Sequence, residues 1–336
     1  MDFVPAPVAF LTHERYLDHD PGSWHPECPD RLRAVWKGID DADLGDAIER
    51  IVPRAANRTE LLRVHDAGLV DALERFCAEG GGDIDQDTSV VRASWAAAVL
   101  AAGAGLTAIE AIDSGRHQRA FCAVRPPGHH ATPTRPMGFC LLNNIAVAAR
   151  TLADRGERVA IVDIDAHHGN GTQDAFAADP RVLFVSAHQW GAGFYPGSGA
   201  LEETGVGNLI NLPFPANTSG RAYRGALDEV VIPAIEGHQP TWLLISAGFD
   251  AHRADPITQL GLSAGDYADL IGQLLTTCPK TVAFLEGGYD FEALAACSAA
   301  TIGALAGVRA RPEPATDGDV GVDVVTRAKA LREGVA

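Results

Sequence analysis

The chain has 336 residues, 46% of them hydrophobic, so it is long and apolar enough to bury a large core. It carries 44 acidic against 27 basic residues, a formal net charge of −17, which argues against binding to nucleic-acid phosphates because that needs a basic face. The charge would attract cationic small molecules or lysine-rich partners, or would serve solubility alone. We expect one domain over residues 1–307, because no linker or repeat interrupts it, and a peripheral C-terminal extension over 308–336.

Neither the N-terminal residues nor the cysteines indicate export or a membrane. Residues 1–5 lack the basic start of a signal peptide, and we find no run of about 18 uncharged apolar residues. The six cysteines show no CxxC spacing, so we interpret them as reduced thiols. We therefore predict a cytoplasmic protein with no membrane partner and no direct nucleic-acid partner.

Taken in chain order, short apolar runs alternate with helical patterns. The first ninety residues are irregular, with a Pro/His-rich segment at 25–29 and three glycines at 80–82. We predict strands at 8–11, 120–124, 159–164, 182–186, 209–212, 242–246 and 281–285, and helices at 94–112, 142–153, 220–235, 264–275 and 291–305. This alternation predicts an α/β protein whose parallel sheet is covered by helices on both faces.

The strand predicted at 159–164 runs directly into a polar segment. Asp163, Asp165 and His167 occupy every second position there, and alternate residues of an extended strand share one face. A buried cluster of two carboxylates and an imidazole is costly unless a cation sits in it. Aspartate and histidine suit a divalent metal such as zinc.

Three further polar motifs follow predicted strands in the same way. They are Arg-Pro-Pro-Gly-His-His at 125–130, Gly-Phe-Asp at 248–250 and Glu-Gly-Gly-Tyr at 286–289. The carboxyl ends of parallel strands share one edge of a sheet, where ligands of α/β proteins bind. We therefore expect all four motifs to meet at one site.

Together these motifs fit metal-assisted hydrolysis. Asp165, His167 and Asp250 supply three ligands and leave a position open for water, which is the pattern of a catalytic zinc. His129 and His130 are adjacent and could act as general base and electrostatic helper.

Two orienting partners and an oxyanion donor complete this hypothesis. Asp163 and Asn170 are candidates to orient the two imidazoles, and the Tyr289 hydroxyl could donate a hydrogen bond to an oxyanion. Each motif alone also has an ordinary structural interpretation: a turn, a helix cap or a half-buried tyrosine. Their joint placement at one sheet edge favours the catalytic one.

At these motifs the chain resembles the histone deacetylase family, with its bacterial members and the acetylpolyamine amidohydrolases. The shared segments, in the family's order, begin at Arg125, Gly138, Asp163, Gly248 and Glu286. Judged by this order of motifs, the resemblance covers roughly residues 8–307. The resemblance implies the three-layer α/β/α arginase–deacetylase fold, with a central parallel sheet of about eight strands.

The resemblance also assigns roles to individual residues. Asp165, His167 and Asp250 match the zinc ligands, and Tyr289 matches the tyrosine that polarises the scissile carbonyl. His130 matches the general base and acid. His129 matches the electrostatic partner of that base, and Asp163 matches the aspartate that holds it. Asn170 stands at the position where class I members have aspartate and class II members have asparagine, so here the chain resembles class II.

The resemblance implies a substrate tunnel and potassium sites as well. Tunnel residues would be Phe139, Tyr195, Gly138 and Ile257, with Tyr195 in place of the usual phenylalanine. An inner potassium ion would use Asp163, Asp165, His167, Ser186 and Ala187; a second would use carbonyl groups of Phe176, Asp179, Val182 and Asn208. Asp85 or Asp87 could bind substrate at the rim, although a solvated acidic loop is the simpler interpretation.

We therefore predict a zinc-dependent deacetylase acting on an acylated lysine or polyamine substrate. Potassium is expected as a further cofactor, and a homo-oligomer is a possible assembly. Hydrolysis of other small acyl-amides or esters is the alternative on the same site. An arginase-like dimanganese hydrolase would need further aspartate ligands, and only Asp163 is spare. A non-catalytic acyl-lysine binding module would be expected to lack His130 or Tyr289, and both are present.

Overall fold

The computed structural model describes residues 6–22, 24–310 and 312–334. Residues 1–5, on which the expectation of no leader rests, lie outside these ranges. Ten strands are β1 (Val8–Leu11), β2 (Ile48–Ile51), β3 (Gly81–Asp83), β4 (Ser89–Val91), β5 (Arg119–Cys122), β6 (Val159–Asp163), β7 (Val182–Gln189), β8 (Leu209–Phe214), β9 (Trp242–Ala247) and β10 (Thr281–Leu285) in the described part of the chain.

The helices of the same ranges are α1 (Asp30–Asp41), α2 (Arg58–Leu61), α3 (Ala67–Ala78), α4 (Ser94–Asp113), α5 (Asn144–Asp154), α6 (Asn170–Phe176), α7 (Gly220–Ala226), α8 (Ile232–His238), α9 (Ala264–Leu274), α10 (Phe291–Ala306) and α11 (Val322–Glu333). The helix predicted over 220–235 is interrupted, because a π-helical turn at Leu227–Val231 separates α7 from α8. The sequence pattern did not reveal β2, β3, β4, α1, α2, α3, α6 or α11.

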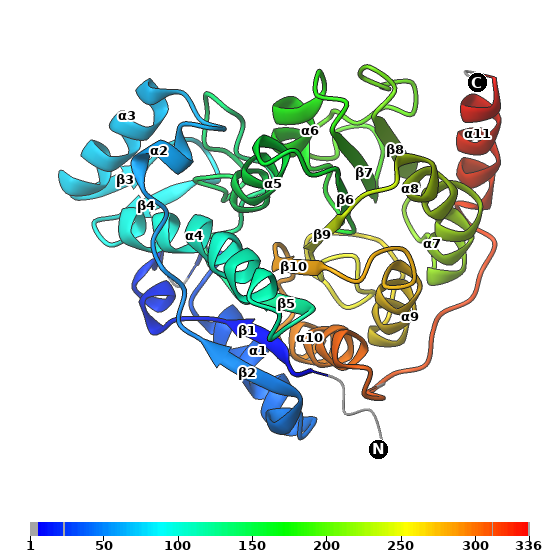
Figure 1. Cartoon of the computed structure of the whole chain (residues 1–336), viewed down its shortest axis with the longest axis horizontal. Coiled ribbons are helices and arrows are strands. Elements are labelled where there is room, and N and C mark those ends of the chain that lie inside the picture. The colour runs from blue at the N-terminus through cyan, green and yellow to red at the C-terminus, as the bar shows by residue number, and fades with distance from the viewer. Residues whose placement is uncertain (1–5, 23, 311, 335–336) are drawn as a thin grey trace.

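Eight of the strands form one parallel sheet in the order β2-β1-β5-β10-β9-β6-β7-β8. Helices α4 and α5 pack together over one face, and α1, α10 and α9 form the layer on the other (Figure 1). The predicted α/β/α fold with a central parallel sheet of eight strands is therefore confirmed.

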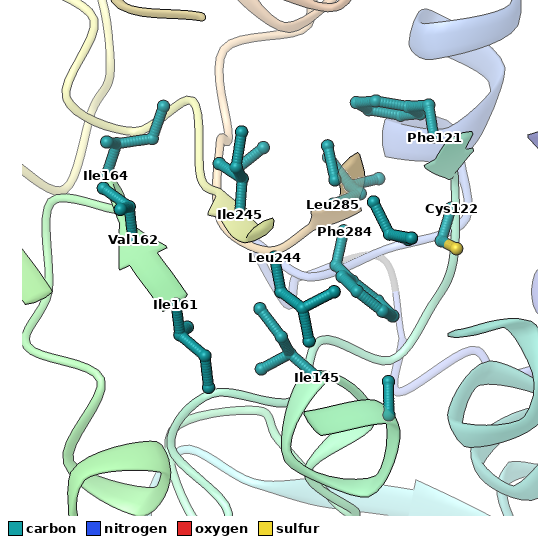
Figure 2. Packing of buried hydrophobic residues seen from close by; sticks show 14 of the residues in the cluster. Phe121, Cys122, Ile145, Ile161, Val162, Ile164, Leu244, Ile245, Phe284 and Leu285 are labelled. Carbon is teal, nitrogen blue, oxygen red and sulfur yellow. The ribbon is translucent and has the colours of Figure 1, made fainter. Parts of the chain in front are cut away.

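The central strands are apolar on both faces, as expected for a sheet covered by two helical layers. Leu244 of β9 and Phe284 of β10 point toward Ile145 of α5, while Ile245 and Leu285 point to the opposite face (Figure 2). All of these side chains are buried. The alternation fixes the register, because a shift by one residue would exchange the two faces.

Helix α4 is long and apolar enough, by length and composition, to cross a membrane. In its most apolar window 72% of the residues are buried in the molecule. Core helices pass the same test, so this observation is weak evidence for a span. All six cysteines are free.

The segment after α10 runs past α9 and ends in α11, which lies beside α7 and β8 (Figure 1). Helix α10 ends at Gly307, whose φ of +72° is left-handed and suits glycine. Glu313 accepts a hydrogen bond from the backbone N–H of Ala264 at the start of α9. The division into a domain ending at residue 307 and an extension stays a prediction.

Candidate active site

The four motif-bearing strands are direct neighbours in the sheet. Strands β5, β10, β9 and β6 stand side by side and run in the same direction, so the segments that follow them emerge at one edge. The structure therefore brings together motifs that are up to about 160 residues apart in sequence, as the pattern of strand ends predicted.

The turn after β6 holds two carboxylates and an imidazole together. The strand ends at Asp163, one residue before the predicted end, so the shared face of an extended strand does not explain how Asp165 and His167 come together. Instead, the Asp163 Oδ1 atom accepts the N–H of Asp165 at 3.1 Å, and the Asp165 Oδ1 atom accepts the N–H of His167 at 2.8 Å. Two successive side-chain turns of this kind replace the strand, because aspartate readily binds the backbone two residues on.

Asp165, His167 and Asp250 meet at the base of the site. His167 Nδ1 lies 2.9 Å from Asp250 Oδ2 and 3.2 Å from Asp165 Oδ1. Backbone groups fix both carboxylates: Ala166 N–H donates to Asp250, and Gly287 N–H donates to Asp165, each at 2.8 Å. One donor atom from each of the three residues lies within 4.8 Å of the others, close enough to bind one ion.

The charges at this position favour a cation. Asp163, Asp165 and Asp250 are all buried, and burial together with Asp165 raises the pKa of Asp250. Burial also raises the pKa of Asp163 to about 6, although His129 opposes it. Two carboxylates and an imidazole form a donor set that zinc accepts. The residues present therefore fit a zinc ion.

Glycine is required where the loop after β10 crosses these ligands. A Cβ atom on Gly287 would lie 2.4 Å from Asp250 Oδ2 and 2.6 Å from Asp165 Oδ2. No larger residue fits there without moving the carboxylates. This close approach lets Tyr289, two residues later, border the site.

The two adjacent histidines have different partners. His129 Nδ1 lies 2.8 Å from Asp163 Oδ2, and His130 Nδ1 lies 2.7 Å from Asn170 Oδ1. Burial opposes protonation of His129, but Asp163 and Asp165 raise its pKa well above the usual value. Burial and the neighbouring His129 lower the pKa of His130. The pair thus combines a cationic imidazole with a neutral one.

A pocket of about 300 Å³ opens above this base. Four of the predicted residues form its wall and floor with Tyr289: Gly138, Phe139, Tyr195 and Ile257. His130 and His167 line it as well. Tyr289 is half-buried at the pocket wall, and the Arg31 guanidinium lies over its ring, 4.9 Å from the centroid.

Phe194 also lines the pocket, a residue that the sequence interpretation missed. Its ring stacks on the His167 ring, with centroids 5.0 Å apart and planes 7° from parallel. Tyr195 instead meets His130 edge to face at 5.1 Å, and its hydroxyl is buried without a hydrogen-bond partner. The Gly-Phe-Tyr-Pro sequence offered two adjacent aromatics, and only the backbone path decides which one faces His167.

The residues predicted to bind potassium lie near one another in two groups. Asp163 and Ser186 are register partners on β6 and β7, and Ala187 O accepts the hydroxyl of Tyr223. In the second group, the Asn208 side-chain amide donates to three carbonyl oxygens, those of Phe176, Asp179 and Val182 at 2.8, 3.1 and 2.9 Å. A cation in that carbonyl cage would have to displace the Asn208 amide.

The mouth of the pocket is more exposed and carries charge. Asp87 lines the pocket, and Asp85 forms an ion pair of 3.2 Å with the exposed Arg135. Trp24 is 69% exposed and stacks edge-on against His25, which in turn contacts Phe139. These groups surround the opening without reaching the ligand cluster.

A buried ionic network supports the site from below. Glu27, Arg31 and Arg125 are each fully buried, and both arginines bind the Glu27 carboxylate. Arg31 also donates to the carbonyl of Gly288 at 2.7 Å. The position of Arg31 under the Tyr289 loop depends on α1, which the sequence pattern missed.

Comparison with known proteins is consistent with this geometry. The sequence model of the histone deacetylase domain family matches residues 25–305 of the chain. The chain is 40% identical over 314 residues to a "Probable deacetylase" of Archaeoglobus fulgidus, covering 89% of this chain and 86% of that protein. It is 34% identical over 296 residues to the "Histone deacetylase-like amidohydrolase" of Pseudomonas aeruginosa, covering 85% and 78%. The crystal structure of the HDA15 HD domain superposes with a TM-score of 0.92 at 35% identity, covering 98% of this chain and 95% of that one.

Proposed function

Because this chain belongs to the histone deacetylase family, we propose that it is a zinc-dependent amidohydrolase that removes acetyl or related acyl groups from lysine side chains or acetylpolyamines. The observation that supports this most directly is the meeting of Asp165, His167 and Asp250 beside His130 and Tyr289 at the base of one pocket. A zinc ion bound by the three ligands would supply an acidic water and polarise the acyl carbonyl.

The histidine pair provides the proton transfers. His130 Nδ1 is occupied by Asn170, so Nε2 is the atom that takes a proton and later returns it to the leaving amine. Burial lowers the pKa of His130, which leaves it neutral and able to accept. His129, held by Asp163, keeps positive charge next to the reacting groups.

Tyr289 orients and stabilises the carbonyl oxygen. Burial raises the pKa of its hydroxyl, so the group keeps its proton and can donate a hydrogen bond as negative charge develops. Phe139 and Phe194 offer apolar ring surface for the methylene chain of the substrate. A potassium ion near Asp163 and Ser186 would be a further cofactor.

The test is a metal-dependent assay on defined substrates. Chelator-treated protein should not cleave a fluorogenic acetyl-lysine amide, and one equivalent of zinc should restore cleavage. Acetyl-lysine peptides and an acetylated polyamine, assayed in parallel, would identify the substrate class. If the zinc-loaded protein cleaves none of a broad panel of acyl-amides, the proposal fails.

A further inference from the structure

Asp255 is neither a metal ligand nor a partner of the two histidines, yet its side chain contacts the Tyr289 loop. It follows Asp250 by five residues and is 7% exposed. Its Oδ2 atom accepts the backbone N–H of Tyr289 at 2.8 Å, and its Oδ1 atom accepts the N–H of Ile257 at 3.0 Å. One carboxylate therefore joins the residue that would polarise the carbonyl to a wall of the pocket.

The Tyr289 loop needs such an anchor because of its glycines. Gly287 and Gly288 precede the tyrosine, and Gly288 has a φ of +120°, a conformation that glycine adopts without strain. Asp165 and Arg31 hold these two residues through Gly287 N–H and the Gly288 carbonyl. The Asp255 contact extends that support to the backbone of the tyrosine itself.

Only a carboxylate has the required pair of acceptors. Both of its oxygens accept hydrogen bonds, whereas asparagine of the same shape has one oxygen and one amide donor. The charge is costly here: burial, with Asp250 nearby, raises the pKa of Asp255 to about 7. Because burial disfavours the charged form of Asp255, its carboxylate does not serve the stability of the fold. Positioning of Tyr289 explains its presence better.

We propose that Asp255 is a positioning residue that holds Tyr289 at the base of the pocket through its backbone N–H. This inference rests on the proposed function, because it assigns Asp255 an effect through the catalytic hydroxyl of Tyr289. It predicts that the loss of one acceptor oxygen reduces turnover without removing the metal ligands or unfolding the chain.

Asp255→Asn tests the proposal against Glu292→Gln, which removes an exposed negative charge three residues beyond Tyr289. We expect Asp255→Asn to lower kcat about 10- to 100-fold, since misplacement by about 1 Å can cost 10²-fold, while KM changes less than about threefold. Its Tm should equal or exceed that of the parent protein, because a buried charge is lost. Glu292→Gln should retain parental kcat.

A double-mutant cycle separates positioning from a general effect. If Asp255 acts through the Tyr289 hydroxyl, Asp255→Asn should lower the residual rate of Tyr289→Phe by less than about threefold. Additive losses in the double variant would overturn the proposal. So would an Asp255→Asn variant that does not fold, since Asp255 would then be a structural residue.

Amide hydrogen exchange supplies a readout that needs no activity. Asp255→Asn should speed exchange at least about tenfold in the segment 286–290, the segment 256–258 or both, while Glu292→Gln should not. Unchanged exchange in both segments would contradict the proposal even in a fully active protein. Faster exchange in a protein that cleaves no acyl-amide would uphold the anchor but refute the function on which its catalytic meaning rests.

Discussion

The base and the mouth of the pocket are built in opposite ways. At the base, Asp165, His167 and Asp250 are buried, and backbone N–H groups fix both carboxylates. At the mouth, Trp24 and Arg135 project into solvent. Chemistry at the base therefore depends on fixed geometry, whereas residues at the mouth can change which substrates enter without disturbing that geometry.

Removal of a metal ligand should give the largest effect. Asp250→Ala takes one carboxylate from the buried cluster, so we expect zinc to be lost and hydrolysis to fall by at least about 10³-fold. The zinc content of the dialysed variant, measured by mass spectrometry, checks the first point. A variant that keeps stoichiometric zinc and parental activity would show that Asp250 is not a ligand.

Tyr289→Phe should separate turnover from metal binding. The ring and its contact with Arg31 are kept, so zinc content should not change, whereas loss of the hydroxyl should lower kcat about 10²- to 10³-fold. Steady-state kinetics at saturating zinc measures this. Equal rates in variant and parent would remove Tyr289 from the mechanism.

His65, which lies outside the pocket, should affect the stability of the fold rather than the activity. His65 Nε2 accepts the N–H of Asn143, which caps α5, and burial lowers the pKa of His65 to about 4. The unfolded chain binds this proton more readily, so stability should fall as the pH drops from about 6.5 to 4, by about 3 kcal/mol at most.

Denaturant unfolding at several pH values measures this dependence. His65→Gln should be less stable at pH 7 but should lose less stability on acidification than the parent. An unchanged slope in His65→Gln would mean that other groups carry the acid sensitivity.

Changes at the mouth should be the smallest. Trp24→Ala and Arg135→Ala leave every ligand and histidine in place, so kcat on a small acyl-amide should stay within about twofold. KM for acetyl-lysine peptides should change by about three- to tenfold, because only long substrates reach the mouth. A large fall in kcat on the small substrate would erase the distinction between the two regions.

The sequence predicted the ligand residues at the base of the pocket better than the elements that support them. Apolar runs located the central strands, and polar residues at their ends located Asp165 and Asp250, because buried parallel strands leave so plain a pattern. Strand β2, Ile-Glu-Arg-Ile at the sheet edge, was missed because two adjacent charged residues, Glu49 and Arg50, interrupt its apolar residues. The predicted end of β6 was one residue too late, and the alternation of polar residues beyond it did not distinguish a strand from successive aspartate turns.

Some contacts that depend on tertiary structure left no signal in the sequence. Phe194 and Tyr195 are equally good pocket residues until the loop path is known. Asp255 looks like one more acidic loop residue, and its contact with Tyr289 spans 34 positions. No spacing rule identifies such a pair, because the sheet order and the loop path decide it.

If the proposed function is right, one zinc ion binds where three distant segments of the chain meet. X-ray diffraction from zinc-soaked crystals, recorded at the zinc absorption edge, would locate this ion. We expect one strong anomalous peak at the base of the pocket, about 2.0–2.2 Å from ligand atoms of Asp165, His167 and Asp250. No peak there, or a peak bound by other residues, would contradict it.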